Sequence, residues 1–109
     1  MKAIAIIGFK KSGKTTLALA IAKALKDKNY RVAVLKHSSQ PIPRKESDTE
    51  KFLKEVERVA LITPESTEII FNTSQDLKKV IPLLSADFLV IEGFKSLKYF
   101  PKIICLREE

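Results

Sequence analysis

The sequence predicts an α/β fold with a mostly parallel sheet and helices on both of its faces. Two observations lead to this prediction. Short, nearly continuous apolar runs alternate with segments of helical periodicity along the 109 residues, and such runs are typical of parallel strands that are buried on both faces. A glycine-containing turn also connects the first apolar run to the first helical segment. The length allows a single domain over residues 1–109.

The first part of the chain is predicted to form a strand, a helix and a second strand. The strands are expected at residues 2–7 and 31–35, where the sequence is apolar and rich in branched side chains. The helix is expected over residues 14–28, because apolar residues recur there every four positions. These positions are Leu17, Ile21 and Leu25. This order predicts a βαβ unit with a right-handed crossover.

The rest of the chain is predicted to form shorter elements. After a loop over residues 36–46, Ser47 and Glu50 form the S-x-x-E pattern that begins a helix, which we expect to continue to residue 56. Two short strands flank a turn at residues 64–66. The further predicted elements are strands at residues 60–63, 68–71, 88–91 and 102–106 and a helix at residues 76–84. The only cysteine, Cys105, is interpreted as a small core residue of the last strand.

Residues 8–15, GFKKSGKT, match the phosphate-binding pattern GxxxxGKS/T. Its two glycines let the backbone curl around an anion, so that N–H groups of the turn and of the next helix point at a phosphate. Lys14 adds positive charge, and the Thr15 hydroxyl can bind a Mg²⁺ ion that bridges the β- and γ-phosphates. The motif therefore predicts a P-loop NTPase-like fold that binds a nucleoside triphosphate with Mg²⁺. The predicted nucleotide contacts are Gly8, Lys11, Ser12, Gly13, Lys14, Thr15 and Thr16.

An acid at the end of a neighbouring strand is the second part of a P-loop site, where it holds the metal or orients water. Asp87 and Glu92 flank the strand predicted at residues 88–91, about 16 Å apart along it. Ligands of parallel sheets bind beyond the carboxyl ends of the strands. Glu92 is therefore the candidate metal ligand and catalytic acid, and Asp87 is interpreted as a turn residue. The adjacent Gly93 allows the backbone to approach a phosphate closely.

His37 and Asp48 each have two open interpretations. His37 directly follows the second predicted strand, where it could contact a phosphate or substrate or could simply be solvated. Asp48 could reach Mg²⁺ or an attacking water. An acid in the first turn of a helix is also explained by capping and by the helix dipole, and the residues alone favour this structural explanation.

Composition excludes several other kinds of site. One cysteine and one histidine are too few for a zinc site of Cys and His ligands within one chain. The apolar run at residues 3–7 is too short for a signal peptide or a membrane span, so we expect a cytoplasmic protein that has no membrane segment. The net charge of +7 favours anionic ligands, although the spread of the lysines is also typical of a solvated surface.

Five segments, in their order and spacing, resemble the molybdopterin-guanine dinucleotide biosynthesis protein B (MobB) family. They are residues 8–17, 35–37, 47–49, 86–95 and 101–103. The P-loop alone is generic, but Leu-Lys-His at the end of one strand and Glu-Gly-Phe-Lys at the end of another are more specific. The resemblance extends over residues 2–106, nearly the whole chain.

The resemblance implies a homodimeric GTP-binding protein with at most weak GTPase activity. It implies that this protein assists a partner, the guanylyltransferase MobA, in attaching GMP to molybdopterin. It also implies phosphate binding by Gly13, Lys14 and Thr15, contacts of Asp48 and Glu92 with Mg²⁺ or the γ-phosphate, and a nucleotide-site role for His37. Guanine specificity rests on the resemblance alone, because the chain has no Asn-Lys-x-Asp segment.

Two alternatives remain open at this point. One is a small phosphotransferase that uses ATP and binds a metabolite near His37 and Lys95. Kinases of this architecture carry an arginine-rich lid, for which residues 41–45 are a weak candidate. The other is a basic nucleic-acid-binding module, which is disfavoured because the sequence has no surface motif of interleaved aromatic and basic residues.

Overall fold

The structure, a computed structural model, describes residues 1–8, 13–43, 47–94 and 101–105. The chain divides into two compact units, one of Met1–Ser39 with Pro82–Glu109 and one of Gln40–Ile81. Each unit is built around its own sheet. The expectation of a single domain over the whole chain stays a prediction.

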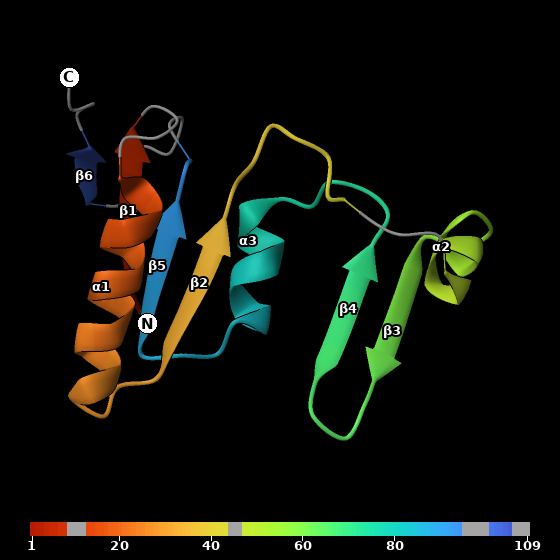
Figure 1. Cartoon of the computed structure of the whole chain (residues 1–109), viewed down its shortest axis with the longest axis horizontal. Coiled ribbons are helices and arrows are strands. Elements are labelled where there is room, and N and C mark those ends of the chain that lie inside the picture. The colour runs from red at the N-terminus through yellow and green to blue at the C-terminus, as the bar shows by residue number, and fades with distance from the viewer. Residues whose placement is uncertain (9–12, 44–46, 95–100, 106–109) are drawn as a thin grey trace. The chain divides into compact units, whose positions relative to one another are not determined.

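The first unit contains a four-stranded parallel sheet in the order β2-β5-β1-β6. Its strands are β1 (Lys2–Gly8), β2 (Val32–Lys36), β5 (Phe88–Glu92) and β6 (Lys102–Cys105). The helix α1 (Lys14–Asp27) connects β1 to β2 and packs against β1, β5 and β2. The predicted βαβ unit is therefore present, with β5 inserted between its two strands. Figure 1 shows that β1, β2 and β5 point to the same end of the sheet, where α1 begins.

Both faces of this sheet are covered. On one face, the buried residues Ile6, Ala18 and Val90 form a cluster against which Leu17 and Ile21 of α1 pack. Two of the three apolar positions predicted for this helix, Leu17 and Ile21, thus face the sheet, as the spacing of four residues requires. On the opposite face, three side chains have no exposed surface, namely Ala5, Leu89 and Ile91. The predicted α/β fold with a mostly parallel sheet is confirmed.

The second unit contains α2 (Asp48–Leu53) and an antiparallel hairpin of β3 (Arg58–Ile62) and β4 (Thr67–Phe71). The Thr63 hydroxyl accepts hydrogen bonds from the N–H groups of Glu65 and Ser66, at 3.3 and 3.0 Å, and so closes the predicted turn. In the predicted capping box, the Ser47 hydroxyl accepts a hydrogen bond from the Glu50 N–H at 3.4 Å. This hydrogen bond fixes the start of α2 where the pattern places it.

Two helices are shorter than predicted, and each has a local cause. The Leu53 carbonyl accepts a hydrogen bond from the Asn72 side-chain amide at 3.0 Å, which satisfies the last carbonyl of α2 and ends the helix before residue 56. The helix predicted at residues 76–84 is α3 (Leu77–Val80) followed by the 3₁₀ turn η1 (Ile81–Leu83). Pro82 has no N–H to donate and cannot continue an α-helix.

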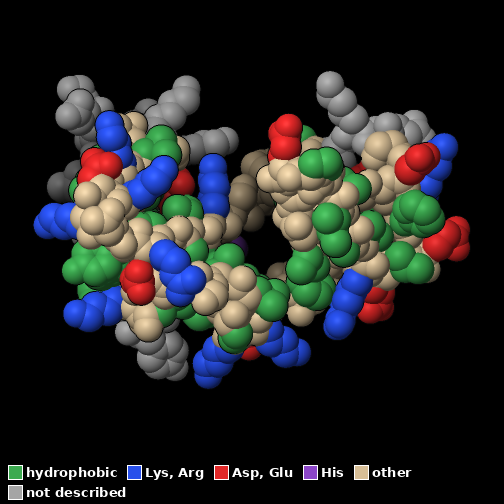
Figure 2. Space-filling view, turned by 90° about the horizontal axis from the view of Figure 1, so that it is seen from below, with side chains coloured by type: hydrophobic (Ala, Val, Ile, Leu, Met, Phe, Trp, Pro, Cys, Tyr) green, Lys and Arg blue, Asp and Glu red, His purple; other side chains and the backbone are tan. Residues whose placement is uncertain are grey.

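The surface carries charges of both signs. Figure 2 shows lysine and arginine side chains spread over the face that it presents, with acidic and apolar side chains between them. This distribution fits a solvated surface. Among the helices of the described residues, none is long and apolar enough to span a membrane.

Candidate nucleotide-binding site

The carboxylate of Glu92 and the hydroxyl of Thr15 meet at the carboxyl end of the parallel sheet. Thr15 lies in the first turn of α1 and donates a hydrogen bond to Glu92 Oε1 at 2.8 Å. Glu92 is the last residue of β5, and only 6% of its surface is exposed. A buried carboxylate requires a hydrogen-bond donor, and Thr15 provides one. The structure therefore brings together two of the three residues predicted as metal ligands, although 77 positions separate them in the sequence.

The start of α1 is suited to binding an anion. Gly13, its N-cap residue, has a φ of +87°, and a Cβ atom added at this position would meet no other atom within 4 Å. Gly13 has no side chain that could cap the helix, and the first turn of α1 contains no acidic residue. The N–H groups of a helix N-terminus of this kind can bind a phosphate. Gly8 is the buried last residue of β1, and the side chain of Lys14 is half-buried.

Three further predicted contacts belong to the loop and the start of α1. Lys11 and Ser12 lie outside the described residues. Thr16 is the exposed residue that follows Thr15 in α1. The contacts of Lys11, Ser12 and Thr16 with phosphate stay predictions.

Backbone hydrogen bonds hold Glu92 between the neighbouring strands. Its carbonyl accepts a hydrogen bond from the His37 N–H at 2.8 Å, and the next N–H, that of Gly93, donates to the Ile6 carbonyl at 2.9 Å. His37 follows β2, and Ile6 belongs to β1. The strand that carries Glu92 is therefore fixed on both sides where it ends.

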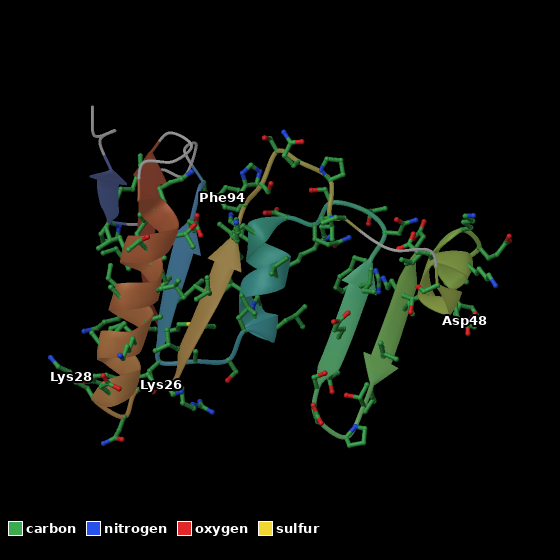
Figure 3. All side chains as sticks on the ribbon, in the orientation of Figure 1. Lys26, Lys28, Asp48 and Phe94 are labelled. Atoms are coloured by element: carbon green, nitrogen blue, oxygen red, sulfur yellow. The ribbon has the colours of Figure 1, made fainter. Side chains whose placement is uncertain are left out.

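Gly93 permits a close approach that the sequence alone did not predict. Its φ is +94°, and a Cβ atom at this position would lie 2.8 Å from the His37 carbonyl oxygen. The chain then brings the ring of Phe94 against the ring of His37, with the centroids 4.3 Å apart and the planes tilted by 36°. Figure 3 shows Phe94 at this end of the sheet. In the sequence, the glycine directly after the acid at the end of the strand was the signal that could have predicted this close approach to His37.

The two aspartates considered as candidate metal ligands, Asp87 and Asp48, have structural partners. Asp87 precedes β5, and its Oδ2 atom accepts a hydrogen bond from the Arg31 N–H at 2.8 Å, as expected of a turn residue. Asp48 belongs to the second unit, where its side chain is 91% exposed and lies 3.8 Å from the Lys51 ammonium. Figure 3 shows Asp48 on α2. Its predicted contact with Mg²⁺ stays a prediction.

The donor set at this edge fits Mg²⁺ together with a nucleotide. Hydroxyl and carboxylate oxygens are the protein ligands that Mg²⁺ prefers, and it binds through one or two of them plus phosphate oxygens and water. In the described part of the chain, no three His, Cys, Asp or Glu side chains form a cluster that could hold a metal alone. Metal binding here would therefore depend on the phosphates of the nucleotide.

Together, the parallel sheet, the glycine turn that leads into α1 and the Thr15–Glu92 pair define a P-loop NTPase-like protein. Comparison with known families is more specific. Residues 3–109 match the family described as molybdopterin guanine dinucleotide synthesis protein B, MobB, and the chain belongs to this family. The resemblance that the five sequence segments indicated is thus confirmed.

Similar proteins include two candidate molybdopterin-guanine dinucleotide biosynthesis adapter proteins. The chain is 34% identical to the one from Methanocaldococcus jannaschii, over all of this chain and 49% of that protein. It is 29% identical to the one from Bacillus subtilis, over 97% of this chain and 65% of that protein. The chain therefore spans about half of the first relative and about two thirds of the second.

Solved structures support the fold. The crystal structure of Bacillus subtilis MobB superposes with a TM-score of 0.81 at 26% identity, over all of this chain and 70% of that one. A structure of the MobB homologue from Bacillus stearothermophilus gives a TM-score of 0.75 at 23% identity, over 99% and 66% of the two chains. At 23% identity, the similarity to the Bacillus stearothermophilus protein shows the fold alone.

Proposed function

We propose that this protein is a GTP-binding adapter of molybdopterin guanine dinucleotide biosynthesis with weak GTPase activity. The observation that carries the proposal is the 2.8 Å hydrogen bond between Thr15 and the buried carboxylate of Glu92, beside a phosphate-binding turn. Membership of the MobB family, and the names of the two adapter relatives, support the choice of pathway.

The residues at the edge of the sheet have separate roles in this proposal. Gly13 and the first turn of α1 bind phosphate through N–H groups, and Lys14 neutralises its charge. Thr15 and Glu92 would hold Mg²⁺, which would neutralise negative charge on the nucleotide phosphates. Glu92 also orients the water that attacks the γ-phosphate. His37 supports this edge through its N–H, and its ring is a candidate contact of the nucleotide.

Slow hydrolysis is expected of a P-loop site to which no arginine is supplied. The arginines of the described residues are Arg31 and Arg58. Arg31 precedes β2, at the opposite end of the sheet from Glu92, and Arg58 of the second unit lies 5.3 Å from the ring centre of Phe71. Small GTPases without a supplied arginine turn over at about 10⁻⁴ to 10⁻² per second, and we expect a rate in this range.

The adapter role requires a partner that uses the bound nucleotide. We propose a MobA-type guanylyltransferase as this partner, with molybdopterin as the compound that receives GMP, in the cytoplasm. The proposed homodimer is supported by the hairpin of the second unit, where Ile62 and Ile69 are 76% and 58% exposed on the same face. A two-stranded sheet is marginally stable alone, and a second copy of this hairpin would cover the exposed side chains.

The proposal is tested by measuring GTP hydrolysis with and without a MobA-type guanylyltransferase. We expect slow hydrolysis by the isolated protein, and a change in the rate or in the yield of guanylyl transfer when the partner is added. Sedimentation of the isolated protein tests the dimer. Turnover of ATP at about 1 per second or faster with a small-molecule acceptor, which is typical of kinases, would instead establish the phosphotransferase alternative.

A further inference from the structure

Lys36 lies beside Glu92 on the face of the sheet that carries α1. The two residues are partners in the parallel register of β2 and β5, on strands about 4.8 Å apart. Val32 and Val90, which precede them by an even number of positions on the same strands, contribute to the cluster under α1. Because side chains alternate between the faces of a sheet, Lys36 and Glu92 are directed to this same face.

The end of β2 cannot move freely relative to Glu92. The His37 N–H donates to the Glu92 carbonyl at 2.8 Å, and the His37 carbonyl oxygen lies 2.8 Å from the position of a Cβ atom on Gly93. The rings of His37 and Phe94 add a contact between the segments that follow the two strands. The backbone of Lys36 is therefore held next to the carboxylate.

The ammonium group of Lys36 is nevertheless not used by Glu92. Opposite charges at directly paired positions of a sheet commonly interact. Here the carboxylate accepts the Thr15 hydroxyl, and among the residues that the structure describes Lys36 has no ion pair. Lys36 is also exposed. An exposed cation that has no ion pair with any described residue thus lies at the edge of the sheet where an anion is expected.

We propose that Lys36 binds the γ-phosphate of the nucleotide and so distinguishes nucleoside triphosphates from diphosphates. This inference rests on the proposed function. In P-loop proteins the metal held by the helix hydroxyl and the strand acid bridges the β- and γ-phosphates, so the γ-phosphate lies on the side of the acid. Lys36 is next to that acid, whereas Lys14 follows the phosphate-binding turn. Because the motif lysine of a P-loop reaches the β- and γ-phosphates, Lys36 would add a second cation at the γ-phosphate.

The test compares GTP with GDP binding, in the presence of Mg²⁺, for the wild type and Lys36→Met. We expect the affinity for GTP to fall about 10-fold to 100-fold, as for the loss of a contact with a charged group, and the affinity for GDP to change less than about twofold. Lys36→Arg should retain most of the selectivity for GTP. If Lys36→Met does not fold, Lys36→Gln provides the same comparison.

A matched control is Lys26→Met, which removes an exposed lysine from the last turn of α1 at the other end of the unit (Figure 3). It should leave both affinities unchanged. Equal losses of GTP and GDP affinity in Lys36→Met, or no loss, would overturn the role of Lys36 while wild-type binding upholds the nucleotide site. Absence of nucleotide binding by the wild type would overturn both proposals.

Discussion

The parallel sheet of the first unit and the hairpin of the second unit differ in how their strands are stabilised. The central strands of the parallel sheet contain five side chains with no exposed surface, namely Ala5, Ile6, Leu89, Val90 and Ile91. In the hairpin, Ile70 is the buried strand residue at 7%, whereas Ile62 and Ile69 are largely exposed. Burial on both faces fixes the backbone of the parallel sheet. The hairpin is stabilised mainly by the hydrogen bonds between its two strands and by its turn.

This difference explains why the two units support functional residues unequally. Glu92 ends a strand whose three preceding residues have no exposed surface, and neighbouring strands hold the peptide groups on both sides of it. Asp48 lies on a six-residue helix with its carboxylate in solvent. Chemistry that needs an acid placed within a fraction of an ångström is better supported by a rigid element. The structural evidence for the nucleotide site therefore comes from the first unit.

The largest expected effect is on the free energy of unfolding, and it compares the core of the parallel sheet with the hairpin. Ile91→Ala should lower the free energy of unfolding by about 2–5 kcal/mol, because a cavity forms in a close-packed interior. Ile62→Ala, at a concentration where the protein is monomeric, should change it by no more than about 0.5 kcal/mol. Chemical denaturation measures both. Equal losses would show that the hairpin is as well packed as the sheet.

The next prediction compares the two acids at the ends of β5. Glu92→Gln should slow GTP hydrolysis about 100-fold, in the range for loss of a residue that orients the attacking water, while nucleotide affinity changes only a few-fold. Asp87→Asn should alter neither, because its side-chain oxygen can still accept the Arg31 N–H. A single-turnover assay reports the rate. Slower hydrolysis by Asp87→Asn, with Glu92→Gln unaffected, would instead place the catalytic acid at the Asp87 end of β5.

A third prediction compares Gly93 with Gly13, two of the glycines with positive φ in the site. Gly93→Ala should cost about 1–3 kcal/mol of stability, because it combines backbone strain with a contact of 2.8 Å to a backbone oxygen. Gly13→Ala has the same kind of φ but open space around the new Cβ, so its cost should be about 1 kcal/mol. Thermal unfolding of the two variants makes the comparison. A larger loss in Gly13→Ala would argue against a tight approach of β2 to β5.

The smallest expected effect is on the part of the GTP affinity that depends on Mg²⁺. Thr15→Ala should weaken GTP binding about tenfold when Mg²⁺ is present, since one oxygen ligand is lost, and should have little effect when EDTA removes the metal. Titration calorimetry under the two conditions measures this difference. An equal loss with EDTA would remove Thr15 from the metal site and leave it only its hydrogen bond to Glu92.

Much of the first unit could be predicted from local patterns. Apolar runs and helical periodicity predicted β1 and α1, and the position of Glu92 at a strand end predicted that it lies at the same edge of the sheet as Thr15. The phosphate-binding turn falls mostly on residues 9–12, outside the described residues. The strand order was not predictable in the same way, because β5 joins β1 and β2 through pairing between residues far apart in the sequence. The register of Lys36 with Glu92 depends on that order and was missed.

The ends of helices and the contacts between rings show a second limit of prediction from the sequence. The end of α2 depends on Asn72, which reaches the Leu53 carbonyl from 19 residues away. The contact between His37 and Phe94 depends on the left-handed backbone at Gly93. Such tertiary interactions override local propensity, and no pattern within a short window of sequence contains them.

The central claim is that this chain binds a nucleoside triphosphate with Mg²⁺ through its P-loop. The most direct measurement is a calorimetric titration of the wild type and Lys14→Ala with GTP and ATP, with and without Mg²⁺. The wild type should prefer GTP and bind it more tightly with Mg²⁺, and Lys14→Ala should lose at least about 100-fold in affinity while its melting temperature is unchanged. Binding of Mg-GTP by Lys14→Ala as tight as that of the wild type would contradict the claim.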